Sequence, residues 1–288
     1  MSKEILTAIV PIGPNHLLEN KIHMWYQEAN SVSNLLRVIL VQDVPPKFEF
    51  IDLLNDKYKD FNNCEVINGN FGGPGAARNH AIDISLTPWL CFWDSDDYPH
   101  IASVVDAVQG ASTKNSSVII GAFNRSRSDS KFHTEDNFSS SRSLETVAED
   151  PGIWRMVFSQ DAIDQNRFEN IRMAEDQIFL FDLNLSRKEI FFTPKCFYTY
   201  FTTGHDKLTL NRKALNDLDL AIDKVIQRIQ REPERLDDFT TRIVANIFRA
   251  SIRNSSLGLK IRAVGKFFFL LRNYPANRAV LINRLLGL

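Results

Sequence analysis

The chain has 288 residues, of which 44% are hydrophobic and 24% are charged, and its formal net charge at pH 7 is −1. This is the composition of an ordinary globular protein, with ample apolar material for a core, in one large domain or in a domain with an appendage. A net charge this close to zero excludes any argument from total charge for a polyanionic partner.

The first hundred residues alternate strand-like and helix-like segments. Short apolar runs predict buried strands at 5–10, 37–41, 65–67 and 89–93. Helix-like segments separate these strands near 17–36, 48–61 and 76–85. Such an alternation with short connections predicts an α/β fold with a mainly parallel, Rossmann-like sheet flanked by helices.

The pattern changes in the second half of the chain. It predicts strands at 117–123 and 191–201, helices at 154–166 and 173–183, and a long mobile loop at 124–150. From residue 213 the pattern is helical, with breaks at Pro233, at Gly258 and near Pro275. We therefore expect a sheet-based domain at 1–212 and an α-helical extension at 213–288.

The charges are distributed unevenly along the chain. After Asp238 there are nine Lys or Arg residues and no Asp or Glu. Basic amphipathic helices of this kind can lie on an anionic membrane surface, cap the preceding domain or associate into a homo-oligomer. These three interpretations stay open, but a nucleic-acid partner is not expected, because no groove-reading motif accompanies the charge.

The cysteines and the apolar runs indicate the compartment. Cys64, Cys91 and Cys196 show no metal-ligand spacing, which is typical of a reduced compartment. The N-terminus enters a strand pattern without the apolar region of a signal peptide, and no uncharged apolar run approaches the length of a membrane span. We expect a cytoplasmic protein, either free or peripheral on the cytoplasmic face of a membrane.

Polar features follow three of the predicted strands. Asp43 follows the strand 37–41, the loop GGPG (72–75) follows the strand 65–67, and the cluster DSDD (94–97) follows the strand 89–93. In open parallel sheets, ligands bind beyond the carboxyl ends of the strands. The three features are therefore expected to converge on one binding rim.

The cluster DSDD is a candidate metal site. Carboxylates this close together repel one another and raise one another's pKa unless a cation is present. Oxygen ligands suit Mg²⁺ or Mn²⁺, which complete their shell with water and substrate phosphate. Asp94, Asp96 and Asp97 are therefore candidate ligands. The alternative is that Asp94 caps a turn and the other two are solvated.

The glycine-rich loop is a candidate phosphate-binding element. It allows a close approach to the backbone, and the helix after it begins with free N–H groups. Arg78 is predicted in the first turn of that helix, where a cation opposes the helix dipole, which favours a binding role over a structural one. Gly73 and Arg78 are candidate nucleotide contacts, and a plain tight turn is the alternative.

Five segments, taken in chain order, resemble the family 2 glycosyltransferases of the GT-A fold. They are IVPIGPN (9–15), VILVQD (38–43), GGPGAARNHAI (72–82), WLCFWDSDD (89–97) and MAEDQIF (173–179). The resemblance implies a catalytic domain at 1–212, a nucleotide-diphosphate-sugar donor, a divalent cation (Mn²⁺ or Mg²⁺) and inversion at the anomeric carbon. Asp94 and Asp96 match the DxD motif, with Asp96 or Asp97 in direct contact with the metal and Asp94 also placed to reach the ribose.

The same resemblance assigns the nucleotide pocket. Pro11 ends the first strand where the family opens its base pocket, and Asp43 matches an acid that accepts a hydrogen bond from uracil. Relatives usually read DDGS or NDGS at this point, whereas this chain reads QDVPP. The loop TTGHDKLTL matches a polar loop that closes over the diphosphate, with Lys207 facing phosphate and His205 as a further metal ligand.

The resemblance also implies the catalytic base and the acceptor side. Asp176, in the pair Glu175-Asp176, matches the base that takes the proton of the acceptor hydroxyl, and Glu175 is the second choice. Trp154 matches a segment that lines the acceptor side, where it would stack on a sugar ring. Carboxylates also stabilise helix N-termini, and Trp is often a core residue, so structural roles remain alternatives.

These observations predict a metal-dependent inverting glycosyltransferase that uses a UDP-sugar. The expected acceptor is a glycan or a lipid-linked hydroxyl, in surface polysaccharide or glycolipid synthesis. One alternative is a sugar-1-phosphate nucleotidyltransferase, which usually carries a glycine-rich basic loop where this chain has IVPIGPNH. The other is a catalytically inactive nucleotide- or glycan-binding module, which the presence of both DSDD and ED disfavours.

Overall fold

The computed structural model describes residues 4–13, 21–43, 58, 60–111, 115–127, 142–202 and 215–287. The chain divides into two compact units that alternate along the sequence. Unit 1 comprises Met1–Arg142, Gly152–Arg167 and Lys188–His205, and unit 2 comprises Ser143–Pro151, Phe168–Arg187 and Asp206–Leu288. The functional division at residue 212 stays a prediction, since unit 2 takes in segments from both sides of it.

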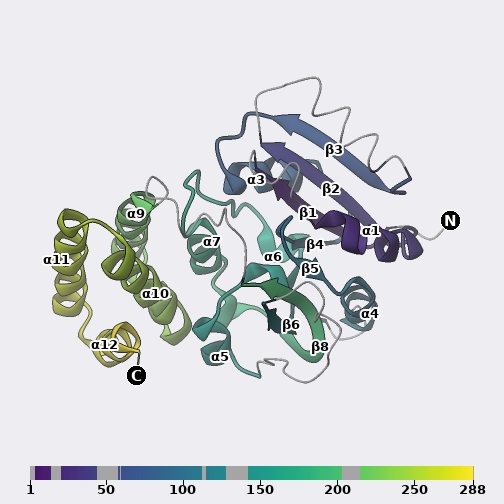
Figure 1. Cartoon of the computed structure of the whole chain (residues 1–288). Coiled ribbons are helices and arrows are strands. Elements are labelled where there is room, and N and C mark those ends of the chain that lie inside the picture. The colour runs from purple at the N-terminus through teal and green to yellow at the C-terminus, as the bar shows by residue number, and fades with distance from the viewer. Residues whose placement is uncertain are drawn as a thin grey trace. The chain divides into compact units, whose positions relative to one another are not determined.

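Unit 1 is built on an eight-stranded sheet in the order β3-β2-β1-β4-β7-β6-β8-β5 (Figure 1). Strand β1 pairs in parallel with β2 and β4, and β2 pairs in parallel with β3. Strand β7 is antiparallel to β4 and β6. The strands are β1 (Leu6–Ile12), β2 (Leu36–Asp43), β3 (Cys64–Gly69), β4 (Trp89–Phe92), β5 (Tyr98–Pro99), β6 (Val118–Ser126), β7 (Met156–Ser159) and β8 (Ile190–Phe201).

The helices of unit 1 cover this sheet. The central strands β1 and β4 are buried throughout, as their continuous apolar runs require, because both faces of a mainly parallel sheet are covered. The predicted α/β fold is confirmed. The helices of unit 1 are α1 (Ile22–Ser31), α3 (Pro74–Ile84), α4 (Ile101–Ala111), η4 (Ile153–Arg155) and α6 (Gln160–Ile163).

Unit 2 is helical and has its own apolar core, to which α7, α9, α10, α11 and α12 contribute. Among the described residues, every helix is too short or too polar to span a bilayer. The predicted C-terminal helices are confirmed, although Gly258 lies inside α11 and does not break it. The helices are α5 (Leu144–Glu149), α7 (Glu175–Leu183), η5 (Leu185–Arg187), α9 (Asp217–Arg231), η7 (Pro233–Arg235), α10 (Asp238–Asn254), α11 (Leu257–Asn273), η8 (Pro275–Asn277) and α12 (Arg278–Leu286).

Two predicted segments differ in the structure. The helix expected at 154–166 is wrong in part, because Met156, Val157 and Phe158 are buried in β7, between β4 and β6, and only α6 (Gln160–Ile163) is α-helical there. The loop expected at 124–150 is wrong in part, since β6 continues to Ser126 and α5 begins after the N-cap Ser143. Residues 48–57 of the helix expected at 48–61 lie outside the described residues.

Candidate functional site

The carboxyl ends of four parallel strands bring the predicted rim together in unit 1. In the sheet register, Ile12 lies opposite Gln42, Asp43 lies opposite Gly69, and Ile9 lies opposite Phe92. Asp43, the glycine-rich loop and the turn Asp94–Asp97 therefore all follow strands that end at the same edge, as expected of a ligand site in a parallel sheet.

The turn Asp94–Asp97 is held from two sides. Arg78 Nη2 donates to Asp94 Oδ1 over 2.8 Å, and the Arg78 side chain is buried. The backbone N–H of Asp94 donates to the Tyr198 hydroxyl over 2.9 Å. Since α3 begins at Pro74, Arg78 lies in the second turn and not in the predicted first turn. Its guanidinium fixes one carboxylate of the cluster in place.

Asp97 faces the protein interior. Its side chain is buried, and Oδ1 accepts a hydrogen bond of 2.8 Å from the backbone N–H of Phe201 in β8. This bond joins the turn to a strand 104 residues away in sequence. Asp96 differs, because its half-buried carboxylate forms no hydrogen bond or ion pair with the described part of the chain.

The donor set of the turn fits a hard divalent cation held by one or two carboxylates. No group of three or more His, Cys, Asp or Glu side chains among the described residues is placed to hold a metal ion. Asp96 supplies a carboxylate without a partner among the described residues, and Asp94 and Asp97 flank it in the same turn. Mg²⁺ and Mn²⁺ are commonly held in this way, with water and substrate phosphate completing the shell.

Asp43 fixes the glycine-rich loop. Its Oδ1 accepts hydrogen bonds from the backbone N–H groups of Phe71, over 2.6 Å, and Gly72, over 2.9 Å. Gly72 has a φ of +84°, a left-handed conformation that favours glycine. Gly73 follows as the N-cap of α3, with Pro74 at the first helical position. Asp43 therefore shapes the loop, and its second oxygen is the one that could meet a base.

Trp154 packs against Tyr198, whose hydroxyl accepts a hydrogen bond from the backbone N–H of Asp94. Its ring stacks on Tyr198 with centroids 4.7 Å apart, and it lies edge-on to Phe123. A Cβ at Gly152 would come within 2.1 Å of the Trp154 ring, so this position admits only glycine without a rearrangement. Trp154 thus has a structural role, and its predicted contact with the acceptor stays a prediction.

The hydroxyl of Tyr198 is kept protonated by its surroundings. Burial raises the pKa of Tyr198 well above its ordinary value, and the charges of Asp97 and Asp94 raise it further. The neutral hydroxyl accepts from the backbone N–H of Asp94 and adds no negative charge beside the carboxylates of the turn.

The structure adds rim residues that the sequence did not reveal. The backbone N–H of Lys21 donates to the Ser95 carbonyl over 2.7 Å, and its ammonium lies 4.8 Å from the ring centroid of Phe201. Gln42 is fully buried, and neither its amide nitrogen nor its amide oxygen has a hydrogen-bond partner among the described residues. The amide oxygen of Asn68, opposite Gln42 in the register, is also buried without a partner. Buried unpaired amides are costly, so they suggest a ligand that supplies the missing bonds.

The pair Glu175-Asp176 begins α7 in unit 2. Ala174, the N-cap residue, has a φ of +65°, which is uncommon for a residue other than glycine. Glu175 is buried, whereas Asp176 is half-buried and its Oδ1 accepts from the backbone N–H of Gln177 over 2.8 Å. Such strain at a carboxylate pair motivates a functional hypothesis.

Of Pro11, His205 and Lys207, the structure describes only Pro11. Pro11 is buried within β1, opposite Val41 of β2. His205 and Lys207 lie outside the described residues.

Comparison with known proteins identifies the family. The model of the family described as "Glycosyl transferase family 2" matches residues 29–188. The chain belongs to this family. The recognition from sequence is confirmed, and the match decides against the alternative of a sugar-1-phosphate nucleotidyltransferase.

Two curated relatives of this glycosyltransferase attach sugars to a phosphate-containing polymer. Poly(ribitol-phosphate) beta-N-acetylglucosaminyltransferase TarP of Staphylococcus aureus is 22% identical over 70% of this chain and 67% of its own length. Poly(ribitol-phosphate) beta-glucosyltransferase of Bacillus spizizenii is 27% identical over 57% of this chain, which spans only 29% of that protein.

Solved structures share the fold of this glycosyltransferase. Residues 1–349 of S. aureus TarS in complex with UDP-GlcNAc align with a TM-score of 0.63 and 17% identity, over 98% of this chain and 92% of that one. The mannosyltransferase PcManGT from Pyrobaculum calidifontis, in complex with GDP-Man and Mn²⁺, aligns with a TM-score of 0.52 and 13% identity, over 99% and 86%. At these identities the likeness establishes the fold alone.

Proposed function

We propose that this glycosyltransferase moves a sugar from a UDP-sugar to a hydroxyl acceptor, with a divalent cation and with inversion at the anomeric carbon. The observation that carries the proposal is the turn Asp94–Asp97, in which Arg78, Tyr198 and Phe201 position the turn and leave Asp96 available. At the carboxyl edge of a parallel sheet, the Asp96 carboxylate can hold a divalent cation, and the cation can in turn bind a diphosphate.

The cation would be held by Asp96, with Asp94 of the DxD motif beside it in the turn. When bound, it supplies positive charge that stabilises the leaving diphosphate. In this proposal Asp97 anchors the turn through Phe201. The Mn²⁺ named for PcManGT supports a cation at such a fold.

The base pocket would lie beside Asp43 and Gln42. Asp43 holds the glycine-rich loop through one oxygen and keeps the other for a base edge that donates. The Gln42 amide can both donate and accept, as pairing with uracil would require. The UDP-GlcNAc named for TarS supports uracil as the base.

Asp176 would be the general base that takes the proton of the acceptor hydroxyl, with Glu175 as the alternative. The family resemblance supports this role, as does the left-handed Ala174 that precedes the pair. Trp154 would line the acceptor side. His205 and Lys207 are proposed as a further metal ligand and a diphosphate contact.

The proposed acceptor is a hydroxyl of a polyol-phosphate surface polymer. Both curated relatives are named for poly(ribitol-phosphate), which supports this class of acceptor. The proposed donor sugar is glucose or N-acetylglucosamine, the two sugars for which the relatives are named.

The direct test is UDP release from UDP-glucose and UDP-N-acetylglucosamine, with and without a ribitol-phosphate polymer, in Mn²⁺ or in EDTA. We expect release that depends on both metal and polymer. UDP binding without release on any acceptor would support the inactive binding module. In the same assay with GDP-mannose, GDP release from this donor and no UDP release from the other two would overturn the roles of Asp43 and Gln42.

A further inference from the structure

Helix α11 of unit 2 has two apolar faces. Ala263, Phe267 and Leu270 are buried on the inner face, where Phe267 packs edge-on against Phe248 of α10. Leu257, Ile261, Val264 and Phe268 recur every three or four residues, so they form a second stripe along one side of the helix. We call this set the α11 stripe. A helix that only capped the protein would need the inner face alone.

The α11 stripe is exposed. Leu257, Ile261 and Phe268 keep 74%, 65% and 63% of their surface accessible. Nine large apolar side chains are exposed in the described part of the chain, and seven of them belong to α11 and α12. A Cβ added at Gly258 or Gly265 would meet nothing within 4 Å, so this side of α11 is open. Apolar side chains gathered in this way mark an interaction surface.

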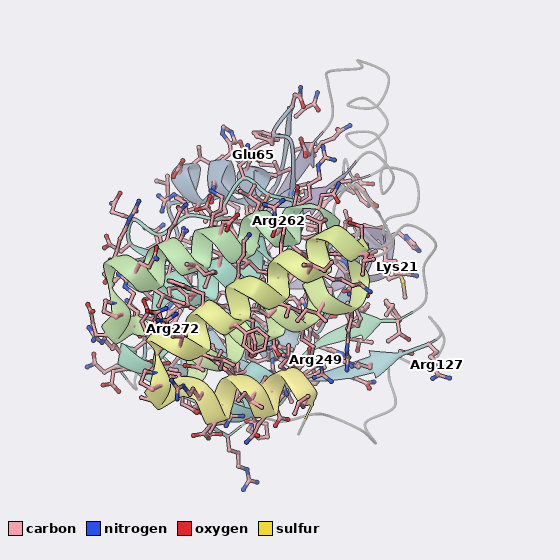
Figure 2. All side chains as sticks on the ribbon, turned by 90° about the vertical axis from the view of Figure 1, so that its left-hand side faces the viewer. Lys21, Glu65, Arg127, Arg249, Arg262 and Arg272 are labelled. Carbon is pink, nitrogen blue, oxygen red and sulfur yellow. The ribbon has the colours of Figure 1, made fainter. Side chains whose placement is uncertain are left out.

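The charges around the α11 stripe are positive. At 100° per residue, Lys260 and Arg272 lie on its two sides, and neither forms an ion pair with the described residues. Arg262 and Lys266 pair with Asp219 of α9. Figure 2 looks onto α11 and labels Arg262 and Arg272. Since the acids of α9 pair with Arg262 and Lys266, the positive charge beside the α11 stripe comes from Lys260 and Arg272.

We propose that the α11 stripe docks on an anionic lipid bilayer. The apolar side chains would enter the boundary between headgroups and acyl chains, and Lys260 and Arg272 would face anionic headgroups. The proposal concerns unit 2 alone and goes beyond the transfer reaction, so it can be tested without donor or acceptor.

Other occupants fit these residues less well. A polyanionic polymer would meet the cations but has no use for four exposed apolar side chains in a row. A second copy of the chain in a two-fold interface over the α11 stripe would place only Lys and Arg of one copy beside those of the other, and like charges across an interface are unfavourable. The bilayer satisfies both the apolar and the cationic part of the surface.

Vesicle flotation tests the proposal. The full chain is floated with phosphatidylcholine vesicles that contain or lack phosphatidylglycerol, at low and high salt. We expect binding to the anionic vesicles that weakens with salt. The double variant Ile261→Gln/Phe268→Gln should lower the affinity by about tenfold or more. The double variant Lys260→Gln/Arg272→Gln should lower it by roughly fivefold per charge.

Matched controls separate docking from general effects. Leu86→Gln removes a side chain of unit 1 that is 81% exposed, and Arg231→Gln removes an exposed cation of α9. Both should bind as the wild type does, and thermal melts should show that all variants fold. The proposal is overturned if the wild type binds no vesicle, if the stripe variant binds as well as Leu86→Gln, or if the chain is a dimer that only the stripe variants dissociate.

Discussion

The turn Asp94–Asp97 and the outer face of α11 both place charge at a surface, but they do so in opposite ways. In the turn, Arg78 fixes the Asp94 carboxylate, and the backbone N–H of Phe201 fixes the Asp97 carboxylate. The Tyr198 hydroxyl accepts from the backbone N–H of Asp94. On α11, Lys260 and Arg272 are long side chains with no ion pair in the described structure. A small ligand needs charges in fixed positions, whereas a membrane surface needs only the right sign over a broad area.

Two arginines in ion pairs, the buried Arg78 and the half-buried Arg228, give a second comparison between the units. Arg78 of unit 1 holds Asp94 at the rim. In unit 2, Arg228 pairs with Glu169 over 2.6 Å and with Asp182 over 2.7 Å. Burial raises the pKa of Asp182, and the bond from Arg228 lowers it, with burial prevailing. Arg228 therefore serves the stability of α9 and its neighbours, whereas Arg78 serves both stability and the site.

The largest expected effect comes from the carboxylate proposed to do chemistry in unit 2. Asp176→Asn should lower turnover by about a thousandfold, because the acceptor hydroxyl loses its base, while UDP affinity stays as in the wild type. Glu175→Gln is the matched variant, one residue earlier in the same turn of α7. Turnover and UDP titration measure the two effects. If Glu175→Gln shows the larger loss, the base is Glu175.

Replacing the two arginines sharpens the comparison between units. Arg78→Met and Arg228→Met should each lower the free energy of unfolding by about 1 to 3 kcal/mol, because each removes an ion-pair partner from a partly buried carboxylate. Only Arg78→Met should also lose UDP binding. Denaturant unfolding gives the free energies, and titration gives the affinities. Normal UDP affinity in Arg78→Met would remove Arg78 from the site.

The rate of thiol labelling measures the opening of unit 1. Cys64, Cys91 and Cys196 all lie in unit 1. Burial raises the pKa of Cys64 to about 12 and that of Cys196 to about 11, so few thiolates exist at pH 8 in the folded state. Thiol labelling at pH 8 should speed up in Arg78→Met and stay slow in Arg228→Met. Equal labelling rates would mean that the units unfold together.

A smaller effect is expected at the rim from Gln42→Leu. The change removes a buried amide without partners, so it should raise the free energy of unfolding by about 1 kcal/mol. It should also weaken UDP binding, since the proposed base contact is lost. Stabilisation without loss of affinity would leave Gln42 as an unexplained buried amide.

The smallest expected effect lies on α11. Gly265→Ala should raise the free energy of unfolding by roughly 0.5 to 1 kcal/mol, because the added methyl group meets nothing within 4 Å and alanine is the better helix former. Vesicle affinity should not change. A destabilised Gly265→Ala would mean that this face of α11 is covered, which would contradict the docking proposal.

Much of the sheet could be predicted because its strands are continuous apolar runs. The run at 89–93 predicted β4, and the acids after it predicted the candidate rim. The run Met156–Phe158 was read as helix, since a three-residue apolar run fits either structure and only pairing with β4 and β6 decides.

The internal partners of the rim could not be predicted from the sequence. Tyr198 and Phe201 lie 104 residues from Asp94 and Asp97, and no local pattern records such bonds. Gln42 reads as an ordinary strand residue until its burial is known. The acids could be predicted because three carboxylates within four residues after an apolar strand are visible in the sequence. The roles of Tyr198 and Phe201 depend on tertiary contacts, which the sequence does not show.

The central claim is that Asp96 and a divalent cation hold the donor diphosphate. Calorimetric titration of UDP into the wild type, Asp96→Asn and Asp161→Asn, in Mn²⁺ and in EDTA, tests it most directly; Asp161 is an exposed acid of α6 in the same unit. We expect Mn²⁺-dependent binding in the wild type and Asp161→Asn, and no gain from Mn²⁺ in Asp96→Asn. Equal UDP affinity in Mn²⁺ and EDTA for the wild type, or an undiminished gain from Mn²⁺ in Asp96→Asn, would contradict the claim.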